Sequence, residues 1–155
     1  MLPAEDVQTY PRPPALQPVP QRLRATLGGG TILDTDRALR VLETHHAPTY
    51  YIPFADVTAG RVEARGGSFC EWKGQARYWT LEAGGETRER CAWDYPDPTR
   101  AFAAIRAHLA IYAWALDAAW VGEMRVRPQP GDFYGGWVTD NLSGIVKGGP
   151  GTEGW

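Results

Sequence analysis

The sequence predicts a mainly β protein built from antiparallel sheets with one amphipathic helix. Short β-prone runs separated by glycine-containing turns fill most of the chain, and a Gly-Gly pair at residues 84–85 lies between two of them. Only residues 97–116 repeat apolar side chains at helical spacing. The 155 residues are the usual size of one domain with its own core.

The first segment, residues 1–21, is rich in proline and lacks a continuous apolar run. Proline fixes φ and removes a backbone donor, so we expect an extended, mobile arm here. A secretory signal peptide needs an apolar stretch, and this segment has none, so we expect no signal peptide here.

From residue 22 to residue 127 the pattern predicts the body of the domain. Residues 23–27 and 31–33 flank a triple-glycine turn, and residues 38–44, 49–52 and 61–65 are further β-prone runs. Residues 76–81 and 87–93 flank Gly84 and Gly85 and predict the clearest hairpin. Residues 118–121 and 124–126 predict a last hairpin.

The predicted helix begins after Asp97, where an N-cap residue precedes proline. Apolar side chains then follow at three- and four-residue steps from Phe102 to Leu116. Residues 128–155 form a Gly/Pro/aromatic extension that includes Trp137 and Trp155. So many aromatic residues predict that the extension packs on its own domain or on a partner subunit.

Composition disfavours several classes of partner. The formal charge is −2 without a block of like charge, so neither nucleic acid nor a membrane surface is an expected partner. No apolar stretch reaches the length of a membrane span. Two cysteines are too few for a disulfide framework, and we expect a reducing compartment, the cytoplasm.

Two motifs resemble a known bacterial family. The runs CEWKGQARYW at residues 70–79 and AWDYP at residues 92–96 are similar to the signature of the domain of unknown function 427 family. Glu43, YYIP at residues 50–53 and Asp56-Val57 resemble its first half. GDFYGGW at residues 131–137 and KGGPG at residues 147–151 resemble its longer members, which carry a C-terminal extension.

The resemblance implies a small β-tent (Mss4-like) architecture, similar to the zinc-binding domains of methionine sulfoxide reductase B and cereblon, and it implies no established reaction. Those related domains hold zinc with two Cys-x-x-Cys pairs, which this sequence lacks. His45 and His46 are adjacent and would point to opposite faces of an extended segment. We therefore expect no metal and no cofactor.

Three residues are the candidates for catalysis. Cys70 precedes Lys73 by three residues, and a nearby ammonium favours the nucleophilic thiolate. The alternative is that Cys70 is a small buried side chain at the start of a strand. Glu43 is either a catalytic acid or base, or one member of a buried structural pair with Lys73, an arginine or a tyrosine hydroxyl. Lys73 in turn pairs either with Glu43 or with the carboxylate or phosphate of a ligand.

A pocket is predicted where the two motifs meet. Closing the hairpin at residues 83–86 brings the segment before Tyr78 beside the segment that follows Trp93. We expect one concave site lined by Glu43, Tyr51, Lys73, Tyr78, Trp93 and Tyr95. The aromatic residues could instead be core filling.

Three functions fit these residues. The first is a module that binds a small molecule or a modified side chain in the aromatic pocket. The second is an enzyme using Cys70, Lys73 and Glu43. The third is a protein-interaction or assembly factor, with a homo-oligomer formed through the extension.

Overall fold

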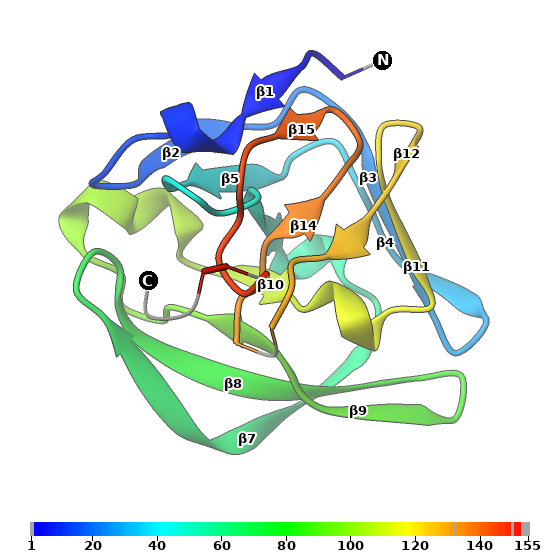
Figure 1. The fold of residues 1–155 in the computed structure, drawn as a ribbon. Helices are drawn as coiled ribbons and strands as arrows, with labels where there is room; N and C mark the ends of the chain where they lie inside the picture. The colour runs from blue at the N-terminus through cyan, green and yellow to red at the C-terminus, as the bar shows by residue number, and fades with distance from the viewer. Residues whose placement is uncertain (1, 132, 150, 153–155) are drawn as a thin grey trace.

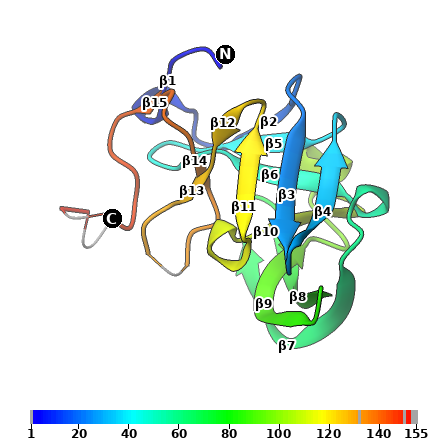
Figure 2. The same cartoon turned by 90° about the vertical axis from the view of Figure 1, so that its right-hand side faces the viewer.

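The protein is mainly β, as predicted, with two antiparallel sheets facing each other (Figures 1 and 2). The computed structural model describes residues 2–131, 133–149 and 151–152. The larger sheet has the strand order β2-β5-β6-β10-β9-β8-β7 and the smaller has the order β12-β11-β3-β4. The β-tent implied by the family resemblance stays a prediction.

The strands of the larger sheet are β2 (Ala15–Pro18), β5 (Leu39–Leu42), β6 (Thr49–Pro53), β7 (Gly60–Cys70), β8 (Gly74–Ala83), β9 (Glu86–Asp94) and β10 (His108–Ile111). Those of the smaller sheet are β3 (Leu23–Leu27), β4 (Gly30–Thr35), β11 (Ala118–Val121) and β12 (Met124–Arg125). Two further pairs are β1 (Glu5–Asp6) with β15 (Leu142–Ser143) and β13 (Arg127–Pro128) with β14 (Trp137–Val138).

The main core lies between the two sheets. Alternate residues of β3, such as Leu23 and Leu27, are buried against side chains of the larger sheet that include Ile52, Leu81 and Leu109. A second cluster, on the other side of the larger sheet, contains Trp93 and Tyr95, with Trp72 and Tyr78 packed against it, whereas Trp79 packs against the main core. This second cluster is where the candidate site forms.

The three hairpins expected from turn residues are confirmed. β8 pairs with β9 across Gly84 and Gly85, β3 pairs with β4, and β11 pairs with β12. Gly28 and Gly84, at the tips of two of these hairpins, touch each other and both have positive φ. A Cβ on Gly84 would lie 2.0 Å from the Gly28 carbonyl oxygen, so the turns meet backbone to backbone.

The predicted amphipathic helix is wrong. Residues 97–116 instead contain the 3₁₀ helix η3 (Arg100–Ile105), the strand β10 and the 3₁₀ helix η4 (Ala113–Ala115). Ala107 has a φ of 59°, which no continuous right-handed helix can contain. β10 then pairs with β6 on one side and β9 on the other, at the centre of the sheet.

The N-terminal segment is paired rather than mobile. β2 forms an antiparallel ladder with β5, β1 pairs in parallel with β15, and η1 (Val7–Thr9) lies between them. Val7 and Tyr10 are buried with Leu42 in a small third cluster. The two ends of the described chain therefore hold each other.

Part of the C-terminal extension packs on the body of the protein. Trp137 is 1% exposed, and its indole N–H donates to the Ile111 carbonyl at 2.8 Å. Trp155, expected to take part, lies outside the described residues. In the part of the chain that is described, no helix has the length and apolar character needed to cross a membrane.

Candidate functional site

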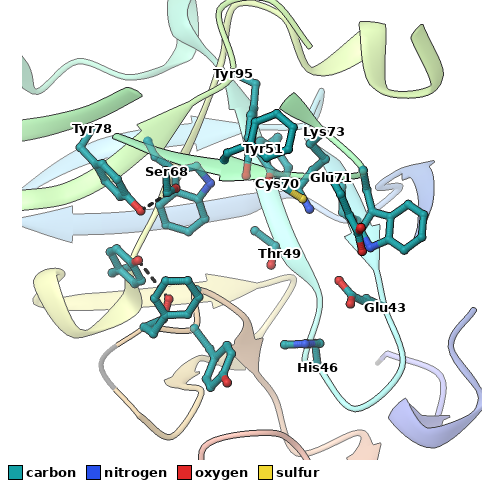
Figure 3. A pocket seen from close by; sticks show the side chains of 18 of the residues that line it. Glu43, His46, Thr49, Tyr51, Ser68, Cys70, Glu71, Lys73, Tyr78 and Tyr95 are labelled. Atoms are coloured by element: carbon teal, nitrogen blue, oxygen red, sulfur yellow. Dashed lines mark hydrogen bonds between the residues drawn. The ribbon is translucent and has the colours of Figure 1, made fainter. Parts of the chain in front are cut away.

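A cavity of about 430 Å³ opens beside the end of the β7–β8 hairpin. Its walls come from one face of β7, β8 and β9, from the end of β5 through β6, and from the C-terminal extension (Figure 3). All six residues of the predicted pocket line it: Glu43, Tyr51, Lys73, Tyr78, Trp93 and Tyr95. Whether they bind a ligand stays a prediction.

The strand register explains why the two motifs meet. β7 ends at Cys70, a short turn follows, and β8 begins at Gly74. Tyr78 pairs with Trp93, so residues that precede Tyr78 lie beside residues that follow Trp93. The Lys73 ammonium is accordingly 5.8 Å from the centre of the Tyr95 ring.

Buried tyrosines form the floor of the cavity. Tyr51 is 1% exposed and Tyr95 is 6% exposed, and their ring centres lie 6.5 Å apart. Burial raises the pKa of both phenols well above the usual range, so both stay protonated at neutral pH. No described residue hydrogen-bonds to the Tyr95 hydroxyl, which borders the cavity.

A second aromatic group forms a side wall. The rings of Trp93 and Tyr112 lie 4.7 Å apart, and the Tyr112 hydroxyl donates to the Phe133 carbonyl at 3.1 Å. Burial, with a contribution from Tyr78, raises the pKa of Tyr112 to about 12. The Tyr78 hydroxyl is 3.1 Å from the Ser68 hydroxyl. These contacts fix the rings that face the cavity.

Charged groups at the cavity are only partly paired. Glu43 lies just beyond β5 and its carboxylate is 3.9 Å from the Arg12 guanidinium, so its partner is an arginine and not Lys73. The Lys73 ammonium lies over the rings of Tyr95 and Phe102. Within the described residues it forms no ion pair, which leaves its positive charge available to a ligand.

Cys70 ends β7 and does not begin a strand, which corrects the sequence-based placement. Its side chain is partly exposed and lines the cavity (Figure 3). The Lys73 N–H donates to the Cys70 carbonyl at 3.2 Å, closing the turn that carries both residues. Cys91 is buried elsewhere, and burial raises the pKa of its thiol to about 11.

Sequence reasoning missed several residues of the wall. His46 was weighed only as a metal ligand, and Tyr112, Tyr134 and Lys147 were not assigned to the pocket. One signal could have found Lys147, because Lys73 and Lys147 are the only lysines in the sequence. Among the described residues, no three His, Cys, Asp or Glu side chains gather as a metal site would require.

Comparison with known proteins identifies the family. The model of a domain of unknown function (DUF427) matches residues 15–122. The chain belongs to the DUF427 family. This confirms the resemblance drawn from the two motifs, and no curated protein matches the chain significantly.

The matched DUF427 region does not contain the whole cavity. It supplies the six predicted residues and Cys70, whereas Phe133, Tyr134, Gly135 and Lys147 follow its end at residue 122. A Cβ on Gly135 would lie 2.1 Å from the Trp93 ring, so this part of the extension rests directly on the side wall. The extension thus completes the cavity of this DUF427 protein.

Proposed function

We propose that this DUF427 protein binds a small planar molecule, or a planar modified side chain, in its aromatic cavity. The volume of about 430 Å³ is within the range of small-molecule sites. Stacked and edge-on rings on several sides suit a flat ligand, because aromatic pairs prefer these geometries.

The observation that carries this proposal is the Tyr95 hydroxyl. Tyr95 is 6% exposed, yet none of the described residues accepts from or donates to its hydroxyl group. Because Tyr95 lines the cavity and no described residue bonds to its hydroxyl, this group can donate to or accept from a polar group of a bound ligand.

The test uses 2-naphthamide, a neutral planar probe, and follows tryptophan fluorescence and NMR shifts of the protein. We expect binding that weakens about five- to tenfold in Tyr95→Phe, the loss expected for one hydrogen bond of roughly 1 kcal/mol. Tyr10→Phe is the matched control, since Tyr10 is buried in the third cluster and bonds to Glu5. Equal loss in both variants, or binding insensitive to Tyr95, contradicts the proposal.

A second candidate function is covalent chemistry at Cys70. This residue is the cysteine that lines the cavity, and it shares its turn with Lys73. An enzyme of this kind predicts rapid alkylation of Cys70 by iodoacetamide below the usual thiol pKa of about 8.5, and slower alkylation in Lys73→Gln. Alkylation that follows the ordinary thiol pKa, or no alkylation of the folded protein, counts against the enzyme.

A third candidate is self-association through the rim of the cavity. Phe69 is 74% exposed and Phe133 is 69% exposed, and both lie at the cavity. Light scattering across a range of protein concentrations should then show a dimer that Phe69→Ser weakens. A monomer at all concentrations removes this candidate.

A further inference from the structure

His46 stands at the cavity wall with one ring nitrogen already engaged. Its Nδ1 lies 3.2 Å from the Gln129 amide nitrogen, and its ring packs edge-on against Tyr134 at 5.3 Å. Within the part of the chain that is described, nothing hydrogen-bonds to Nε2. His46 lines the cavity (Figure 3).

The orientation of the Gln129 amide is set by two backbone groups. Its oxygen accepts from the Ala47 N–H at 3.1 Å, and its nitrogen donates to the Lys147 carbonyl at 3.0 Å. The amide nitrogen therefore has one further hydrogen, which points to His46 Nδ1. Because Gln129 is 2% exposed, water cannot replace these partners.

The tautomer of His46 follows from this arrangement. A nitrogen that accepts from an amide N–H carries no proton, so the proton of the neutral ring is on Nε2. Gln129 acts as a positioning residue that makes His46 a hydrogen-bond donor toward the cavity.

Two ammonium groups line the same cavity, Lys73 from the β7–β8 turn and Lys147 from the C-terminal extension. No described residue forms an ion pair with either of them. Glu43 and Glu71 also line it, but Glu43 faces Arg12 at 3.9 Å and Glu71 is exposed in the turn. Burial lowers the pKa of His46, and the nearby cationic groups of Lys147, Lys73, Arg12 and His45 lower it further.

We propose that the cavity takes a planar ligand carrying an anionic oxygen group, a carboxylate or phosphate, held by the His46 Nε2–H and the ammonium groups of Lys73 and Lys147. This inference rests on the proposed function and adds the ligand's charge to it. Donors that are neutral or cationic suit an oxyanion, and charge-assisted hydrogen bonds are about twice as strong as neutral ones.

The binding test compares probes that share one ring. These are 2-naphthoate, 2-naphthyl phosphate, 2-naphthamide and 2-naphthylmethylamine, measured by calorimetry and by NMR of protein labelled at lysine, which gives signals from two side chains. We expect at least one anionic probe to bind about tenfold tighter than the amide, with shifts of both lysines, and the amine to bind weakest. Whichever of 2-naphthoate and 2-naphthyl phosphate binds more tightly shows whether the site prefers a carboxylate or a phosphate.

Variants test the individual donors. His46→Asn keeps an acceptor for Gln129 but removes the Nε2 donor, and Lys73→Gln removes one ammonium, so each should reduce the anionic preference about three- to tenfold. Arg24→Gln is the matched control, because Arg24 is an exposed cation on β3, outside the cavity. An equal loss in Arg24→Gln would overturn the inference, since it would reflect net charge alone.

The tautomer is tested without any ligand. Nitrogen-15 NMR of histidine-labelled protein should show an unprotonated Nδ1 and a protonated Nε2 for His46. In Gln129→Glu the carboxylate can only accept a hydrogen bond, so Nδ1 should carry the proton instead. A protonated Nδ1 in the parent protein overturns the inference.

The two proposals fail differently. If 2-naphthamide binds with Tyr95 dependence and neither anion binds tighter, the inference falls and the proposed function stands. If none of the four probes binds, both fall.

Discussion

Asp94 shows how one buried carboxylate orders the end of β9. Its side chain is 1% exposed and accepts two bonds from Arg77, at 2.9 and 2.8 Å, and one from the Trp79 indole at 2.9 Å. These contacts lie on the face of the sheet opposite Tyr78 and Trp93. They fix the end of β9, the strand that carries Trp93 of the cavity's side wall.

Replacing this carboxylate should destabilise the protein. Asp94→Asn keeps the shape but turns an N–H toward the Arg77 guanidinium, which we expect to cost about 2–3 kcal/mol, since Arg77 is partly exposed and the loss is screened. Glu86→Gln is the control, because the Glu86–Arg88 pair is exposed and should contribute less than about 0.5 kcal/mol. Urea unfolding measures both, and equal effects would contradict the assignment.

His46 predicts a specific dependence of stability on pH. Burial, together with Lys147 and Lys73, lowers its pKa from 6.5 to about 4 in the folded protein. As pH falls from 6.5 to 4, His46 takes up a proton in the unfolded chain but stays neutral in the folded protein. The contribution of His46 to the free energy of unfolding is therefore complete above pH 6.5 and decreases as the pH falls towards 4. The loss should reach roughly 3 kcal/mol at the acid end.

His46→Asn isolates this effect because it does not titrate. The difference in free energy of unfolding between parent and variant should change across this pH window and be constant above it. His108→Asn is the control, since His108 lies outside the cavity and contacts the Arg106 carbonyl. A parallel pH profile for parent and His46→Asn would show that His46 is not held neutral.

Four of the six pocket residues, Lys73, Tyr78, Trp93 and Tyr95, were predictable because a local signal, the Gly84-Gly85 turn, pairs β8 with β9. Glu43 and Tyr51 belong to the β5–β6 region, and the family resemblance singles out both. Composition singles out Lys147 as one of two lysines, but neither its place at the cavity nor that of His46 was predictable, since both depend on Gln129, which joins segments 82 and 18 residues away in sequence. No short-range pattern records such a contact.

Among the elements, the hairpins are predicted well from the sequence. The segment of residues 97–116, which contains β10, is not, because it was predicted to be a helix. A central strand is buried on both faces, so Leu109, Ala110 and Ile111 are all apolar and show no alternation. With apolar residues of η3 and η4 on either side, the spacing imitates a helix.

The contact between two hairpin tips gives a prediction at this scale. Gly84→Ala would place a Cβ 2.0 Å from the Gly28 carbonyl oxygen in a backbone with φ of 57°. We expect a loss of about 2–4 kcal/mol from clash and strain together.

Gly85→Ala is the matched control for this contact. Gly85 also has positive φ but nothing within 4 Å of an added Cβ, so only the strain of about 1–2 kcal/mol applies. Thermal unfolding should therefore rank parent, Gly85→Ala and Gly84→Ala in falling order of stability. Equal melting temperatures for the two variants would mean that the tips do not hold each other.

For the whole molecule, the extension links stability to the cavity. Deleting residues 131–155 removes the Trp137 side chain from the main core, a change of the kind that costs about 3–5 kcal/mol, and also removes Tyr134 and Lys147 from the cavity wall. We expect a lower melting temperature and loss of probe binding together.

Trp137→Phe separates the two roles of the extension. It removes the indole N–H that bonds to Ile111 but keeps the cavity wall, so stability should fall by about 1–3 kcal/mol with probe binding retained. An unchanged melting temperature on deletion of residues 131–155 would show that the extension does not pack on the domain.

The parallel pairing of β1 with β15 has a consequence for folding rate. Hydrogen bonds such as that from the Asn141 side chain to the Pro3 carbonyl join residues 138 apart. A contact between residues so far apart in sequence closes a loop of nearly the whole chain, which has a large entropic cost. We therefore expect it to form after the local hairpins. Since β15 lies between Trp137 and Lys147, refolding should order the β8–β9 hairpin early and the ligand cavity in the slowest phase.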